Sequence, residues 1–121
     1  NVYHFGYFKE PKLSENKRYY HNLTNLDFFN QIKISLGTKL ALGTDSGSMW
    51  VIAAYNHPMI ILGSNWYDNH TDNLKATIPP IKNGECVFAQ NFLNITTDEI
   101  YEKILFYGVK SENLIEKLFK F

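Results

Sequence analysis

The chain has 121 residues, a length that suits one compact domain better than two. Hydrophobic residues make up 45% of it and charged residues 20%, which is typical of a globular protein with an ordinary core. Twelve basic residues balance twelve acidic ones, so no general field attracts nucleic acid or an anionic membrane. We therefore expect no nucleic-acid partner, and we expect any bound anion to be held by local geometry.

Cys86 is the only cysteine, which excludes an intrachain disulfide framework and a cysteine-rich zinc site. The four histidines show no metal-ligand spacing, so we expect no metal ion. No apolar run approaches the roughly 20 residues that cross a bilayer. The lone thiol and the absence of a signal-peptide layout in Asn1–Glu10 favour a cytoplasmic protein.

The first third of the chain predicts a strand, a loop and a helix. The strand is aromatic-rich and ends near Gly6, the loop is polar and contains Pro11, and the helix has apolar residues at helical spacing. We expect Thr24 or Asn25 to cap this helix and Gly37 to end it. In chain order these elements are Asn1–Tyr7, Lys9–Tyr20 and Leu26–Leu36.

The middle of the chain predicts two buried strands around a helix. Lys39–Gly43 and Met59–Leu62 are short apolar runs, typical of strands buried on both faces, and Gly63 closes the second. Between them, Met49–Tyr55 is apolar nearly all round, so we expect a buried helix. Ser64–Asn83 is the longest irregular stretch, and its length and aromatic residues favour a functional loop.

The last part predicts a fourth strand and two helices. The strand is Glu85–Ala89, and Thr96–Glu99 offers a capping box for the first helix. We expect Ser111 to start the second helix. The apolar positions of the two helices are Ile100, Tyr101, Ile104 and Leu105, and then Leu114, Ile115, Leu118 and Phe119.

The alternation of strands and helices defines the expected fold. Short links and buried-type strands predict right-handed crossovers and a parallel sheet. We therefore expect residues 1–121 to form a single small Rossmann-like α/β domain, with three layers and a parallel sheet of about four strands. In such sheets a ligand binds beyond the carboxyl ends of the strands, in the crevice where the strand order reverses.

The turn from Thr44 to Ser48 lies at that edge and opens a helix. Such a turn presents free backbone N–H groups and the positive end of the helix dipole. Ser46, Gly47 and Ser48 leave room for a phosphate, and the two hydroxyl groups could add hydrogen bonds. The alternative is that Asp45 or Ser46 merely caps the helix, a common arrangement worth about 1 kcal/mol. The turn matches neither the P-loop nor the glycine-rich dinucleotide motif.

The same turn resembles a known family. Asp45–Ala54 (DSGSMWVIAA) and Pro58–Gly63 (PMIILG) are similar to the D-[ST]-G-x-x-H-x-x-A-A…P-x-x-x-L-[FY]-G signature of family 9 glycosyltransferases, which include the lipopolysaccharide heptosyltransferases. The order of elements from Leu23 to Gly63 also matches that family. In these enzymes the signature lies in the second of two Rossmann domains (the GT-B arrangement), which holds a nucleotide-sugar donor.

The resemblance implies that this chain is the donor-binding half of a glycosyltransferase. Asp45, Ser46 and Gly47 would line the donor diphosphate and sugar, and Gly63 and Ser64 would form the neighbouring wall. From the residues alone, Trp66 could stack on a base or sugar, or equally anchor its loop. The full set of candidate donor and phosphate contacts is Thr44, Asp45, Ser46, Gly47, Ser48, Gly63, Ser64 and Trp66.

Two departures from the family limit what can be carried over. Trp50 stands where the family has His, and we expect it to be buried rather than catalytic, with a ligand platform as the alternative. The acceptor-binding domain, which supplies the usual candidate base, is missing from these residues. We therefore assign no catalytic residue and expect this chain alone not to transfer sugar. The rival hypothesis is a non-enzymatic Rossmann-like module that binds a nucleotide or a protein.

Overall fold

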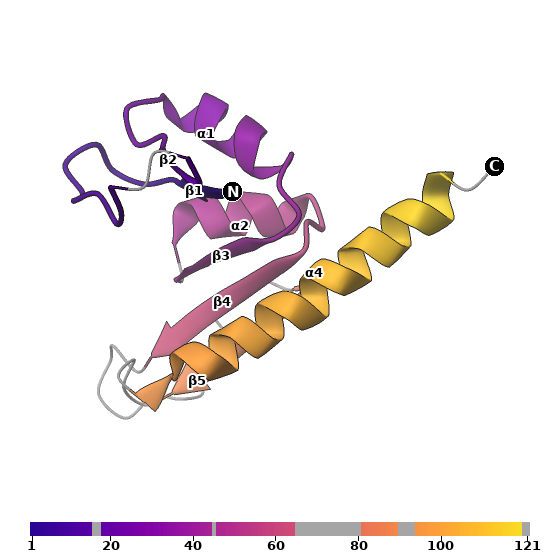
Figure 1. Ribbon diagram of the computed structural model, residues 1–121. Helices are drawn as coiled ribbons and strands as arrows, with labels where there is room; N and C mark the ends of the chain where they lie inside the picture. Colours follow the sequence, from indigo (N-terminus) through magenta and orange to yellow (C-terminus); the bar gives the residue numbers. More distant parts are fainter. Residues whose placement is uncertain (16–17, 45, 65–80, 90–93, 120–121) are drawn as a thin grey trace. The chain divides into compact units, whose positions relative to one another are not determined.

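The computed structural model describes residues 1–15, 18–44, 46–64, 81–89 and 94–119 (Figure 1). Over these residues the chain is a mixed α/β protein whose paired strands are all parallel. It divides into two compact units, Asn1–Gly37 and Thr38–Phe121. We call them the N-terminal unit and the C-terminal unit.

The N-terminal unit contains a two-stranded parallel sheet and one helix. The strands are β1 (Val2–His4) and β2 (Tyr20–Asn22), and the helix is α1 (Phe28–Ser35). The predicted first strand is confirmed but is shorter than expected. β2 was not predicted, because three residues are too few to show the alternation that identifies a strand.

A set of side-chain contacts holds the chain where β1 ends. Gly6 has a φ of 154°, a conformation that L side chains rarely adopt, so the strand stops before it. The Gln31 side chain accepts the Gly6 N–H (2.9 Å) and donates to the Gly6 carbonyl (3.2 Å). His4 contacts the Tyr20 hydroxyl through Nδ1 (2.7 Å) and the Glu10 carboxylate through Nε2 (3.1 Å). These side-chain contacts hold the start of the loop between β1 and β2 in place.

The predicted cap of α1 at Thr24 or Asn25 is wrong. Asp27 caps the helix, because its carboxylate accepts the backbone N–H of the third helical residue (3.0 Å). Thr24 is buried in the preceding turn, where its backbone N–H and its hydroxyl both donate to the Asn22 side chain. Gly37 follows the C-cap residue, as predicted.

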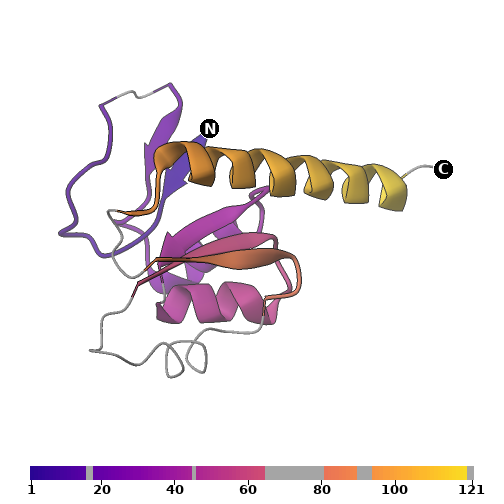
Figure 2. The same cartoon turned by 90° about the horizontal axis from the view of Figure 1, so that it is seen from below.

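The C-terminal unit is a parallel sheet with a helix on each face. Figure 2 shows α2 on one side of the sheet and α4 on the other. The strand order is β3-β4-β5, so the predicted parallel sheet is confirmed, but these three strands form one sheet and β1 pairs in another. The elements are β3 (Ala41–Thr44), α2 (Gly47–Ala54), β4 (Met59–Ser64), β5 (Gly84–Ala89) and α4 (Thr97–Phe119).

β4 is the central strand, and the core lies on its two faces. Met59, Ile60 and Ile61 are completely buried. On the α2 side of the sheet, Gly43 leaves room for Met49, since a Cβ at Gly43 would lie 2.9 Å from the Met49 sulfur. This close contact lets α2 pack tightly against β3.

On the other face, an ion pair joins β5 to α4. Lys103 Nζ lies 2.5 Å from Glu85 Oε1, and this hydrogen bond raises the pKa of Lys103. Glu85 pairs with Ile60 in the sheet register, so both side chains lie on the face that α4 covers. The pair thus links α4 to β5.

Helix α2 differs from the expected buried helix. It begins at Gly47, and only one side of it is buried, through Met49, Ile52 and Ala53. Trp50 is 43% exposed, so the prediction that its side chain is buried is wrong. The sequence did not predict this exposure because apolar residues occupy both sides of the helix. Periodicity alone then does not show which side faces the sheet.

Helix α4 is continuous where two helices were predicted. It runs through Ser111 without a break, because one helical glycine, Gly108, costs only about 1 kcal/mol, and a 23-residue helix absorbs that cost. Its predicted cap is confirmed: the Thr96 hydroxyl accepts the Glu99 backbone N–H (3.2 Å). None of the helices in the described part of the chain is long and apolar enough to cross a membrane.

His57 gives the C-terminal unit a pH-dependent stability. It is buried just after α2, its Nε2 lies 3.3 Å from the Thr38 hydroxyl, and burial lowers its pKa. Below its ordinary pKa of about 6.5, the unfolded chain therefore binds a proton that the folded chain resists. We expect the free energy of unfolding to fall as the pH is lowered from 7 to 5.

His57→Gln is the matched variant, because glutamine does not titrate and can still contact Thr38. Urea unfolding of both proteins at pH 7, 6 and 5 measures the effect. Between pH 7 and pH 5 the wild type should lose more stability than the variant, since only the wild type loses stability through this group. Parallel pH profiles would contradict the prediction.

Candidate functional site

The carboxyl ends of β3 and β4 meet at one edge of the sheet (Figure 1). Thr44, the last residue of β3, pairs with Leu62, and β4 then continues for two residues to Ser64. The prediction that Gly63 ends this strand is therefore wrong. Gly63 lies within β4, beyond the end of β3. The register brings Thr44, the start of α2, Gly63 and Ser64 to the same edge.

Two of the predicted site residues, Asp45 and Trp66, lie outside the described residues. The predicted reversal of strand order is not found among the described strands, because β3, β4 and β5 follow one another in chain order. The candidate site thus consists of the carboxyl ends of β3 and β4 and the adjacent first residues of α2.

Among the described residues, the N-cap residue of α2 does not cap the helix with its side chain. Ser46 is the N-cap residue, with extended backbone angles, but its side chain makes no capping hydrogen bond. Its hydroxyl instead lies 3.2 Å from the hydroxyl of Ser48. The Trp50 N–H donates to the Ser46 carbonyl, so helical geometry leaves the N–H groups of Gly47, Ser48 and Met49 without a carbonyl partner in α2.

The other two described helices begin differently. Asp27 caps α1 with its carboxylate, and Thr96 caps α4, which also carries Asp98 and Glu99 in its first turn. These groups satisfy the first N–H groups and offset the positive end of the helix dipole. The first turn of α2 holds no acidic residue. Among the described residues, no negative side chain therefore offsets the helix dipole at the start of α2, which suits an anion supplied from outside the helix.

Gly47 makes the start of α2 accessible. It is exposed, and a Cβ added to it would meet no atom within 4 Å. Within the described part of the chain, a phosphate oxygen can approach the Gly47 backbone amide without displacing a side chain. The nearby hydroxyl groups of Thr44 and Ser46 belong to the same edge and can donate hydrogen bonds.

These residues support binding more directly than they support proton transfer. The described candidates at the edge offer amide and hydroxyl donors and no side chain that titrates near pH 7. The described residues also contain no cluster of three His, Cys, Asp or Glu side chains that could hold a metal ion. The arrangement can thus hold an anion and stabilise developing negative charge.

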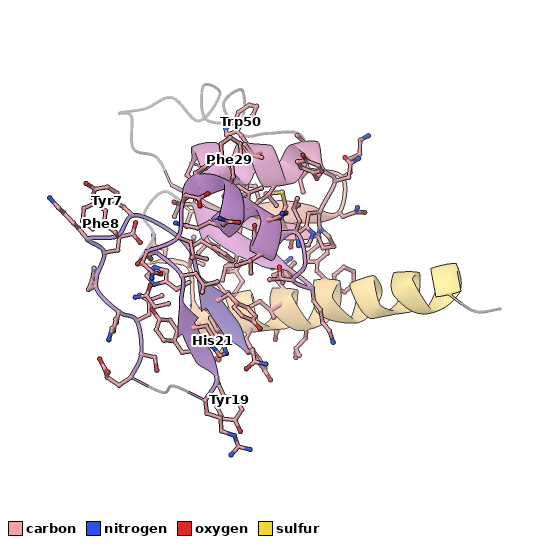
Figure 3. The ribbon with its side chains drawn as sticks, turned by 90° about the horizontal axis from the view of Figure 1, so that it is seen from above. Tyr7, Phe8, Tyr19, His21, Phe29 and Trp50 are labelled. Carbon is pink, nitrogen blue, oxygen red and sulfur yellow. The ribbon has the colours of Figure 1, made fainter. Side chains whose placement is uncertain are left out.

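Trp50 is the feature of this site that sequence reasoning misplaced. Gly47, Trp50 and Ala54 are all exposed, and their spacing places them on one side of α2. No sequence signal identified that exposed side, because apolar residues occur on both sides of the helix. Figure 3 shows the indole projecting from α2 away from the sheet.

Comparisons with known proteins found no similar protein. No family model, curated protein or solved structure matches the chain.

Proposed function

We propose that this chain binds the nucleotide-sugar donor of a glycosyltransferase with the GT-B arrangement, in a Rossmann-like domain. The observation that carries the proposal is the start of α2 at the carboxyl edge of a parallel sheet, where the Ser46 side chain makes no capping hydrogen bond and the Gly47 position is open. The resemblance of Asp45–Gly63 to the family 9 signature supports it, because that signature surrounds this turn. In the proposal the protein acts in the cytoplasm, and a separate N-terminal domain binds the acceptor.

The donor diphosphate would lie at the N–H groups of Gly47, Ser48 and Met49. When the sugar is transferred, negative charge builds on the leaving diphosphate, and fixed donors aimed at that charge lower the barrier. The dipole of α2 adds to this effect, so the proposed role asks for no metal ion. The base that deprotonates the acceptor hydroxyl would come from the acceptor-binding domain.

Ligand-dependent stability tests the proposal. We expect nucleoside diphosphates, their sugar conjugates and inorganic pyrophosphate to raise the melting temperature, because a ligand that binds only the folded state stabilises it. At 100 times the Kd the gain is about 2.7 kcal/mol. Free nucleosides at the same concentration should give a much smaller shift. If none of the phosphate ligands raises the melting temperature at millimolar concentration, the proposal is wrong.

The rival function, a protein-binding module, is favoured by one observation on α4. Tyr101, Leu105 and Phe106 are all exposed on this helix, and contiguous exposed apolar side chains often mark interaction surfaces. Light scattering at rising protein concentration separates the two hypotheses. Self-association without any phosphate-dependent stabilisation would favour the rival.

A further inference from the structure

A hydrogen-bonded turn in the N-terminal unit exposes two aromatic rings. The Glu10 N–H donates to the Tyr7 carbonyl (2.9 Å), which closes a four-residue turn. Phe8 and Lys9 are its central residues. Tyr7 and Phe8 are 58% and 62% exposed, their ring centroids lie 4.6 Å apart, and Lys9 Nζ lies 5.6 Å from the centroid of the Phe8 ring. We call Tyr7, Phe8 and Lys9 the aromatic tip.

Polar contacts hold the aromatic tip in place from both sides. After the tip, the Glu10 carboxylate accepts the Tyr7 N–H (3.1 Å) and lies 3.1 Å from His4 Nε2. The Tyr7 hydrogen bond, and then the contact with His4, lower the pKa of Glu10, so this carboxylate stays ionised at neutral pH. Before the tip, Gln31 of α1 bonds to both backbone groups of Gly6. The sheet and the helix thus hold the two rings at the surface, and Figure 3 shows them together on the loop that follows β1.

The small size of the aromatic tip favours a lipid surface over a protein partner. An aromatic side chain buries about 150–250 Å² when it is fully covered, so two rings offer roughly 300–500 Å². A stable protein interface buries about 800 Å² on each partner. Docking on a bilayer has no such threshold, because its strength grows with the apolar area that is buried and with the charge that faces the lipid.

The charges near the aromatic tip are complementary to anionic lipids. Lys9 belongs to the tip, and Lys12 is exposed three residues further along the same loop. The chain as a whole is neutral, but basic residues outnumber acidic ones in the N-terminal unit. The basic residues there are Lys9, Lys12, Lys17, Arg18 and Lys33, and the acidic ones are Glu10, Glu15 and Asp27. The N-terminal unit therefore has a local positive excess that the composition of the whole chain conceals.

We propose that the aromatic tip docks the protein on an anionic lipid bilayer. The rings of Tyr7 and Phe8 would enter the headgroup boundary, to a depth of about 5–10 Å. Lys9 and Lys12 would face the lipid phosphates. Because the turn is already formed, little conformational freedom is lost on docking. The tip belongs to the N-terminal unit and the proposed donor site to the C-terminal unit, so neither proposal depends on the other.

Co-sedimentation with large unilamellar vesicles tests the inference. The probes are vesicles of phosphatidylcholine alone and of an equimolar mixture of phosphatidylglycerol and phosphatidylcholine. We expect the full chain to bind the mixed vesicles more tightly, and this preference to weaken as salt is added. Phe8→Ala should lower the partition coefficient on the mixed vesicles by at least about 10-fold, because the variant loses the buried ring. Lys9→Gln should lower it by about 5-fold on the mixed vesicles and leave it unchanged on phosphatidylcholine.

Phe29→Ala is the matched control. Phe29 lies on α1 in the same unit and is 82% exposed, so the variant removes the same ring from outside the aromatic tip. We expect its partition coefficient to equal that of the wild type. A loss as large as that of Phe8→Ala would overturn the inference, because binding would then follow exposed aromatic area in general.

Three further outcomes would also overturn the inference. The first is that the wild type sediments with neither kind of vesicle. The second is equal binding to both kinds with no effect of salt, which would leave the lysines without a role. The third is self-association that Phe8→Ala abolishes, seen by light scattering without vesicles, which would assign the aromatic tip to a second copy of this chain.

Discussion

Gly84→Ala should destabilise the C-terminal unit by at least about 3 kcal/mol. Gly84 is the first residue of β5 and pairs with Met59 at the start of the central strand. A Cβ at Gly84 would overlap the backbone carbonyl of Met59, and a backbone atom in a paired strand cannot rotate away as a side chain can. To remove this overlap, β4 and β5 would have to separate. The Met59 N–H would then lose its hydrogen bond to the Asn83 carbonyl (2.9 Å).

Alanine variants of two other glycines allow the loss of stability to be compared by urea unfolding. At Gly43 the added Cβ would meet the flexible end of Met49, which can shift, so we expect a smaller loss than at Gly84. At Gly108 it would meet nothing, and alanine is the better helix former, so Gly108→Ala should stabilise the chain by up to about 1 kcal/mol. If Gly84→Ala is no more harmful than Gly43→Ala, the packing of β5 against β4 is not as described.

The sequence predicted the strands of the C-terminal unit well because burial determined their composition. β3, β4 and β5 are short apolar runs, and the residues of β4 contact helices on both faces. β2 escaped prediction because its three residues, Tyr20–Asn22, have neither the length nor the alternation of a typical strand. Its position depends on pairing with β1, and pairing is a long-range contact that a local pattern does not encode.

The position of the turn at the candidate site was predicted, but its contacts were not. Residues 44–48 were predicted to form a turn, and β3 does end at Thr44 with α2 starting at Gly47. The sequence left open whether Ser46 caps the helix, because a serine side chain can bond to the backbone or to another side chain. The structure selects the contact with Ser48. The exposure of Trp50 was also beyond prediction, since it depends on which side of α2 meets the sheet.

Gly47→Val should weaken the binding of pyrophosphate and of nucleoside diphosphates by about 10- to 100-fold. The Gly47 position is open, so the valine side chain fits the folded protein and occupies the space in front of the α2 amides. A phosphate would then lose one or two charge-assisted hydrogen bonds to the backbone. Calorimetric titration measures the loss, and unchanged melting of the free variant would show that the fold is intact.

Gly108→Val is the control for this substitution. It makes the same change in a described helix, again at a position where a Cβ would meet no atom within 4 Å, and it lies within α4 rather than at a helix start. Both variants introduce a β-branched residue into a helix, so the control shows whether that kind of change affects phosphate binding away from the site. Only Gly47→Val places its side chain at the first residue of α2. A loss of phosphate affinity restricted to Gly47→Val therefore reports the site itself, whereas equal affinities for the wild type and both variants would place the anion elsewhere on the chain.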